Sequence, residues 1–140
     1  MENTLNLIKL CVGCDSPAEL EAWQQQRWQG EAPVHVTRMW PKREAELLEG
    51  GSIYWVFKGA VLARQRLTEL REIRGEDGIL RCGLVLDPAL VHVTATPRRP
   101  FQGWRYLAGA DAPADLPLGR GAEPTLPASI ANALAEMGLR

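Results

Sequence analysis

Several features that would identify a biochemical class are missing from this sequence. No apolar run approaches the roughly 20 residues that a transmembrane helix needs. The first residues, MENTLNLIKLCVG, lack the basic start and long apolar stretch of a secretory signal. The three cysteines, an odd number, fit a reducing compartment better than a disulfide framework. We therefore expect a cytoplasmic protein that does not enter a membrane.

Motifs of catalysis are also missing. The chain has no Gly-x-Ser-x-Gly elbow, no Gly-x-Gly-x-x-Gly and no Walker-type loop. Ser16 suits a helix cap and Ser52 begins a predicted strand, so neither is a candidate nucleophile. The two histidines, His35 and His92, each lie between valines in a predicted strand. We assign no catalytic residue and expect a protein that is not an enzyme.

The cysteines allow three interpretations. Cys11 and Cys14 form a Cys-x-x-Cys pair just before a predicted helix, the position that a redox-active pair takes in thioredoxin-type sites. Together with Cys82 and a histidine they are enough for a zinc site, although the second closely spaced pair of a zinc signature is missing. We favour the third interpretation, buried small apolar side chains, and expect no metal or cofactor.

The net charge of −1 hides an uneven distribution. Residues 33–107 hold twelve Lys and Arg against eight Asp and Glu, whereas the two flanks hold four against nine. A mildly basic middle favours an anionic partner. The excess is far smaller than that of a dedicated duplex-DNA binder.

The 140 residues, of which 46% are apolar, predict a single domain at 1–140, with a barrel-like core at 4–107 and a Pro- and Gly-rich tail at 108–140. Hydrophobic periodicity and turn residues predict its elements. In chain order they are a buried strand within 4–13, a helix at 17–29, a strand within 33–40, a short helix within 41–51, a strand within 52–59, a segment at 60–74 that fits a strand or a helix, a hairpin turn at 75–78, strands within 78–87 and 87–100, and an amphipathic helix at 127–140.

The predicted helix at 17–29 has the clearest signals. Ser16 is a good N-cap, Pro17 fits the first helical position and Glu19 completes a capping box. We expect Leu20, Trp23 and Trp28 to form its apolar face.

This order of elements predicts an α+β fold whose sheet is mainly antiparallel. We prefer a strand for 60–74 because its flanks are typical of turns. Closing the sheet into a barrel, with helices on its flanks, would remove the exposed edges that such a meander leaves.

Several blocks of the chain resemble a bacterial family of short proteins of unknown function. They are LIKLCVG at 7–13, HVTRMWPKR at 35–43, GGSIYWVFKG at 50–59, CGLVLDP at 82–88 and PRRPFQGWRYL at 97–107. This resemblance implies no activity.

A second resemblance is one of layout. The stretch at 37–70, TRMWPKREAELLEGGSIYWVFKGAVLARQRLTEL, is similar to the small β-barrels of the PUA, ASCH and EVE group. There a short helix leads into a Gly-bounded strand, a hairpin turn and a second strand. Many members of that group bind RNA or a modified base beside this hairpin, so the resemblance implies an RNA or nucleotide ligand.

Arginines and aromatic residues are interleaved in the strand-rich blocks, above all in PRRPFQGWRYL. Single-stranded nucleic acid is bound by such surfaces, in which cations contact phosphates and aromatic rings stack on bases. Pro97 and Pro100 remove two backbone donors, so we expect Arg98 and Arg99 to lie off the strand ladder. The candidate ligand-binding residues are Arg38, Trp40, Lys42, Arg43, Lys58, Arg98, Arg99, Trp104 and Arg105.

Three alternatives stay open. The same residues suit a core and its rim, since tryptophans bury large areas and arginine stems cover apolar surface; Trp55, Phe101 and Tyr106 are the expected core anchors. A small hydrolase acting on a phosphorylated or nucleotide substrate would need His35 or His92 beside a carboxylate and arginines. A scaffold protein would use its tail and last helix to bind a partner subunit.

Overall fold

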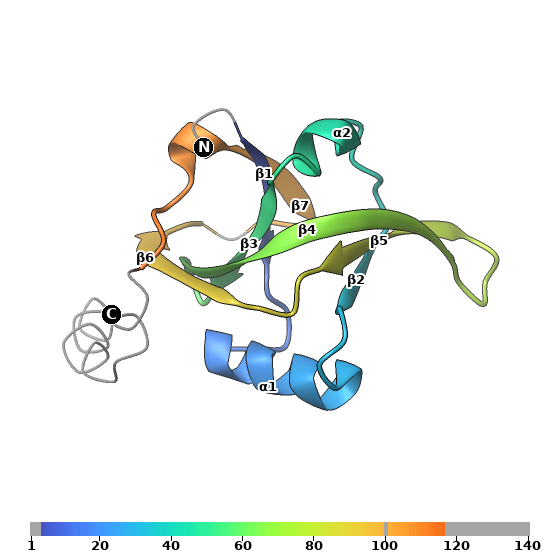
Figure 1. Cartoon of the computed structure of the whole chain (residues 1–140), viewed down its shortest axis with the longest axis horizontal. Coiled ribbons are helices and arrows are strands. Elements are labelled where there is room, and N and C mark those ends of the chain that lie inside the picture. The colour runs from blue at the N-terminus through green and yellow to red at the C-terminus, as the bar shows by residue number, and fades with distance from the viewer. Residues whose placement is uncertain (1–3, 100, 117–140) are drawn as a thin grey trace.

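A computed structural model describes residues 4–99 and 101–116, which form a curved sheet with two helices (Figure 1). In chain order the elements are β1 (Leu5–Leu10), α1 (Pro17–Trp28), β2 (Val34–Thr37), α2 (Glu44–Leu47), β3 (Ser52–Phe57), β4 (Ala60–Arg74), β5 (Leu80–Leu86), β6 (Val91–Pro97), β7 (Trp104–Ala108) and a 3₁₀ turn at Gly109–Asp111. The helix predicted at 127–140 lies outside these described residues.

The seven strands form one sheet in the order β2-β5-β4-β3-β1-β7, with β6 also paired to β4. Every pair is antiparallel except β1 with β3. The long strand β4 organises the sheet. β3 runs along one edge of its first half, and β6 and β5 follow one another along its other edge. The predicted α+β fold with a mainly antiparallel sheet is therefore confirmed.

The predicted closure into a barrel is wrong. Strands β2 and β7 lie at the two ends of the strand order and do not pair with each other in the described part of the chain. β2 has four residues and gives way to a loop that runs to Pro41, so no ladder continues along its free edge. The sheet is open between these two strands, and hydrogen bonds of the Trp104 and Tyr106 side chains, rather than backbone pairing, connect its ends.

The ambiguous segment 60–74 is a strand, as preferred. β4 spans fifteen residues, and in its first eight residues Val61, Ala63, Gln65 and Leu67 are buried while their neighbours are half-buried or exposed. This alternation is the period of two that a strand requires. The predicted hairpin turn at 75–78 is present as well, closed by the Gly75 N–H donating to the carbonyl of Ile79 at 3.0 Å.

Helix α1 begins as the sequence predicts but buries a different face. The Ser16 hydroxyl accepts a hydrogen bond from the Glu19 N–H at 3.2 Å. Leu20 and Gln24 are the buried residues, whereas Trp23 is 50% exposed. The expected apolar face is thus wrong at Trp23. Among the described residues no helix is long and apolar enough to cross a membrane.

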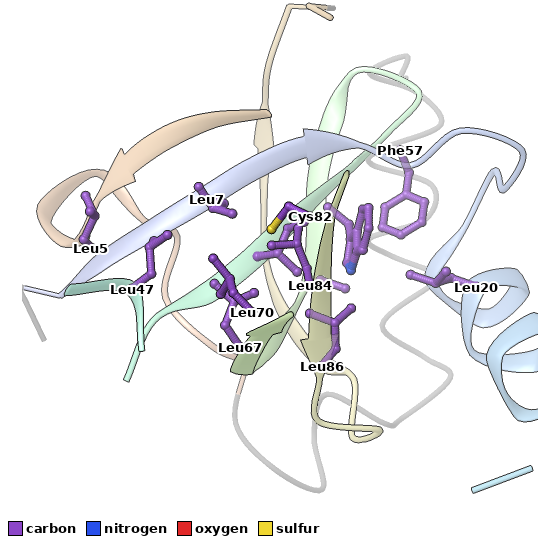
Figure 2. Close-up of a cluster of buried hydrophobic side chains, with 13 residues drawn as sticks. Leu5, Leu7, Leu20, Leu47, Phe57, Leu67, Leu70, Cys82, Leu84 and Leu86 are labelled. Carbon is purple, nitrogen blue, oxygen red and sulfur yellow. The ribbon is translucent and has the colours of Figure 1, made fainter. Parts of the chain in front are cut away.

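The core has two parts, one on each face of the sheet. Because β3 is buried along its whole length, its alternating side chains contribute to both. Ile53, Trp55 and Phe57 belong to the larger cluster, and Tyr54 and Val56 to the smaller one. Figure 2 shows the larger cluster extending from Leu5 on β1 and Leu47 on α2 at one end to Leu20 on α1 at the other. The remaining buried members of the larger cluster are Leu5, Leu7, Ala63, Leu67, Leu70, Cys82, Leu84 and Leu86.

The segment 97–107 is more regular than the prediction. Arg98 and Arg99 follow β6, which ends at Pro97, and so lie outside the strand as predicted, although the Arg98 N–H still donates to the carbonyl of Gly59 at 2.8 Å. Trp104 lies in strand β7 and not in a loop. The ladder with β1 draws 104–108 into the sheet, and the turn at Gly103, with φ 69°, precedes it.

Candidate ligand-binding cleft

The loop after β2 is attached to strand β7 at the far end of the sheet. The Trp104 indole Nε1–H donates to the carbonyl of Met39 at 3.0 Å. The Arg43 N–H donates to the Tyr106 hydroxyl at 3.1 Å. These two hydrogen bonds connect the ends of the strand order, where the sheet is open.

A cleft of about 310 Å³ lies at this junction. The indole of Trp104 meets the ring of Tyr106 edge to face, with centroids 5.0 Å apart. Trp40 is 37% exposed and Met39 is 64% exposed, so apolar surface is open to a ligand. The lining residues are Met39, Trp40, Lys42, Arg43, Trp104 and Tyr106.

The charge around the cleft is modest. Arg43 binds Glu46 through two hydrogen bonds of 2.8 and 2.6 Å, and this carboxylate raises the pKa of the guanidinium. The Trp40 indole donates to the Glu44 carboxylate at 3.1 Å. Lys42 lines the cleft and has no ion pair with any residue in the described part of the chain. The cleft therefore offers an aromatic surface with one uncompensated cation at its rim.

The nine predicted residues do not share one surface. Trp40, Lys42, Arg43 and Trp104 line the cleft. Exposed Arg38 lies in the same loop without lining the cleft.

Arg98 and Arg105 belong to the other face of the sheet. Alternation along β7 directs Arg105 away from Trp104 and Tyr106, toward the side on which Phe101 packs against the smaller core cluster. The guanidinium carbons of Arg98 and Arg105 lie 5.4 and 5.3 Å from the Phe101 ring centroid. These two arginines are held by Phe101 and are separated from the cleft by the sheet itself.

Lys58 and Arg99 lie elsewhere. Lys58 adopts φ 47° in the turn between β3 and β4, and its ammonium pairs with Asp15 at 3.4 Å. Arg99 is exposed. Neither Arg98 nor Arg99 forms an ion pair with a carboxylate within 4–99 and 101–116.

Sequence reasoning missed Met39 as a lining residue and treated Tyr106 only as a core anchor. Tyr106 does pack partly against the larger core cluster, but it also lines the cleft. The spacing in the sequence could have identified Tyr106 as a lining residue. Trp104 and Tyr106 are two residues apart, so they share a face of the sheet once 104–108 is a strand.

The histidines do not form the site that a hydrolase needs. His35 meets the ring of Trp55 edge to face with centroids 5.2 Å apart, and burial lowers its pKa to about 4. His92 is exposed on β6. Neither histidine has a hydrogen bond or ion pair with a carboxylate in the part of the chain that the structure describes.

The cysteines have the environment of packed side chains. Cys82 is fully buried, while Cys11 and Cys14 are half-buried against the larger core cluster. Burial, reinforced by Cys14, raises the pKa of Cys11 to about 12, and burial raises that of Cys82 to about 11. These pKa values keep both thiols protonated, unlike the reactive thiolate of a redox site. Within the described residues no three His, Cys, Asp or Glu side chains lie together as a metal site would require.

A second cavity, of about 620 Å³, opens on the side of the sheet where Ser52, Tyr54 and Arg64 point. Arg64 binds both carboxylate oxygens of Asp115 at 2.8 and 2.7 Å and the Ser52 hydroxyl at 2.8 Å. Its other charged lining residues are Arg66 and Glu49, so two cations face two carboxylates. This polar cavity was not predicted, and its balanced charge gives it no preference for an anion.

A comparison with protein-family models matches residues 7–140 to a protein family of unknown function, DUF1489. Searches of curated proteins and of solved structures gave no significant match. The matched region contains every block on which the family resemblance was based. The chain therefore belongs to this family of unknown function, DUF1489.

Proposed function

We propose that the protein is a non-enzymatic binding module that holds one nucleotide, free or as part of single-stranded RNA, in the cleft between Trp40 and Trp104. The observation that supports this most is the exposed aromatic surface fixed between the loop after β2 and strand β7. An aromatic side chain stacked on a base contributes about 1–3 kcal/mol by alanine substitution, whatever the base.

The size and charge of the cleft favour a short ligand. Its volume, about 310 Å³, is at the lower end of the roughly 300–1,000 Å³ typical of small-molecule sites. Glu46 compensates Arg43, which leaves few cations to follow a long phosphate backbone. The layout resemblance to the PUA, ASCH and EVE group points to the same class of ligand, by analogy only.

Calorimetric titration of the protein with adenosine 5′-monophosphate and with a short single-stranded oligoadenylate tests the proposal. Trp40→Ala removes a ring whose one side-chain hydrogen bond in the described region is to Glu44, so the fold should persist. We expect it to weaken binding by about five- to 150-fold, the equivalent of one lost stacking contact.

Two variants serve as matched controls. Trp23→Ala removes an indole that is 50% exposed on α1, against 37% for Trp40, and Arg105→Ala removes a cation from the opposite face of the sheet. Both should leave nucleotide affinity within about twofold of the parent, within ordinary surface-mutation effects. Absence of binding by the parent protein, or equal losses for Trp40→Ala and Trp23→Ala, would refute the proposal.

A further inference from the structure

Lys9 is a charged residue on a core-facing side of the sheet. In β1 it follows Leu5 and Leu7 at intervals of two, and both leucines belong to the larger core cluster. By alternation Lys9 shares their face. Its partners across the ladders are Trp55 on β3 and Trp104 on β7. The half-buried lysine stem therefore lies between two tryptophans.

The charge of Lys9 has no counterpart among the described residues. No carboxylate forms an ion pair with Lys9 in residues 4–99 and 101–116. Among titratable groups, Cys11 raises the pKa of Lys9, and the charge of Lys9 in turn lowers the pKa of His35. Burial lowers the pKa of Lys9, which is the expected direction for an ammonium withdrawn from water without a compensating charge. A half-buried ammonium without a carboxylate partner gains from pairing with an anion that reaches it.

His35 supplies an independent observation. Its ring contacts the same Trp55 that neighbours Lys9, and its Nε2 is buried without a hydrogen-bond partner in the described part of the protein. Buried polar atoms are nearly always paired, so an unpartnered one needs an explanation. An oxygen of a bound anion would satisfy Nε2 as an N–H donor and Lys9 as a cation at the same time.

Trp104 connects this pair to the cleft. It is the cross-strand neighbour of Lys9, and its indole forms part of the cleft wall. A ring stacked in the cleft therefore lies against the cross-strand neighbour of Lys9.

We propose that Lys9 and His35 bind the phosphate of the nucleotide whose base occupies the cleft, so that the preferred ligand is a nucleoside monophosphate or a terminal phosphomonoester of RNA. This inference rests on the proposed function for the position of the base. The anion site itself rests only on Lys9, His35 and their two tryptophan neighbours.

The experiment compares adenosine with adenosine 5′-monophosphate on the parent protein and on Lys9→Met, which keeps an unbranched apolar stem. We expect the parent to bind the monophosphate at least about tenfold more tightly, because a hydrogen bond to a charged group typically exceeds a neutral one by this amount. Lys9→Met should abolish that preference and leave adenosine affinity within about twofold. Lys9→Arg should restore part of it. Lys58→Met, which removes a cation already paired with Asp15, is the charge-matched control and should retain the preference.

A second measurement reports on the anion site without the base. Inorganic phosphate is titrated while the imidazole nitrogens of His35 are followed by NMR, and the bound anion should move their signals and raise the pKa of His35. His35→Phe should lower the preference for the monophosphate about threefold or more, as the loss of one hydrogen bond does.

The outcomes separate the two proposals. If neither adenosine nor its monophosphate binds while phosphate still moves the His35 signals, the proposed function fails and the anion site stands. If both nucleoside and nucleotide bind equally, or Lys9→Met and Lys58→Met have equal effects, the anion site is refuted and the cleft stands. If inorganic phosphate leaves the NMR signals of His35 unchanged, the anion site is also refuted.

Discussion

Replacing Gln65 by leucine should destabilise the fold more than its modest change in volume suggests. Gln65 is fully buried on β4, and its amide makes four hydrogen bonds. Its Oε1 accepts from Trp55 Nε1 and from Gln24 Nε2, both at 3.0 Å. Its Nε2 donates to Gln24 Oε1 at 2.8 Å and to the carbonyl of Asp87 at 3.1 Å.

The magnitude follows from the groups left behind. Gln65→Leu leaves the Trp55 indole N–H, on a side chain only 3% exposed, and the Gln24 amide, on a side chain 7% exposed, without their partners. The half-buried Asp87 can bind water instead. A buried polar group left unpaired costs about 1–3 kcal/mol, so two such groups give a loss of about 3 kcal/mol in the free energy of unfolding.

Urea unfolding followed by tryptophan fluorescence measures this loss. With a slope of about 1.5–2 kcal/mol per molar, within the range for small proteins, the midpoint should fall by about 1.5–2 M. Gln26→Leu, the same change at an exposed position of α1, should shift the unfolding free energy by no more than about 0.5 kcal/mol.

The double variant tests the reasoning itself. Gln24→Leu alone leaves Gln65 with Trp55 and Asp87 as partners, so it should cost only about 1 kcal/mol. In Gln24→Leu/Gln65→Leu the Gln24 amide is no longer orphaned and only the Trp55 N–H stays unpaired, so the total should be smaller than the sum of the single changes by about 2 kcal/mol. Strict additivity, or a loss below about 0.5 kcal/mol for Gln65→Leu, would show that the network does not stabilise the fold as argued.

The remaining predictions concern three other positions. Gly51→Ala should lower the unfolding free energy by about 3 kcal/mol, the upper end of overpacking costs, because its Cβ would overlap the carbonyl oxygen of Leu47; an unchanged melting temperature would contradict this. His35 has a folded pKa of about 4 against an ordinary 6.5, so the unfolded chain takes up the proton first and stability falls as the pH drops through this window. Between pH 7 and pH 5 the loss should be about 2 kcal/mol in phosphate-free buffer, and His35→Gln should lack it; equal pH dependence of variant and parent in urea unfolding would disprove the assignment. Asp115→Asn should cost about 1 kcal/mol by the same assay, since its partner Arg64 is partly exposed and solvent weakens the pair; no loss would mean that the pair contributes nothing to stability.

The sequence predicted the elements well where local signals agree. β3 was predicted from its strong β formers, and the hairpin after β4 from Gly75 and Gly78. The period-two pattern of β4 was ambiguous because Leu62, Arg66 and Leu70 also fit a helix. The pairing of β4 with three other strands decides this conflict, and that information is not local.

Whether the sheet closes into a barrel could not be predicted from local signals. It depends on whether β2 and β7 meet, and these strands are separated by most of the chain. β7 itself alternates Trp104 and Tyr106 with Arg105 and Leu107, which is a strand pattern. The neighbouring Gly103 and the two prolines before it favoured a loop, and only the ladder with β1 overrides them.

The candidate site was predicted in composition but not in arrangement. The sequence singled out Trp40, Lys42, Arg43 and Trp104, which line one cleft. It grouped Arg105 with them as one of the interleaved arginines and aromatic residues of PRRPFQGWRYL. Adjacent residues of a strand point to opposite faces, so a prediction of β7 as a strand would have separated Arg105 from Trp104 at once.

The buried polar groups near Trp55 also divide into two kinds. Gln24 and Gln65 satisfy one another and the Trp55 indole, so the fold itself accounts for them. On the same ring of Trp55, His35 keeps an unpartnered nitrogen, and Lys9 beside it has no carboxylate within the described residues. The unpaired nitrogen of His35 does not stabilise the fold, because burying a polar atom without a partner has a desolvation cost. The phosphate proposed above would provide a partner for both His35 and Lys9. For this reason Lys9→Met should leave the unliganded protein as stable as the parent or more stable, while it removes the preference for phosphate.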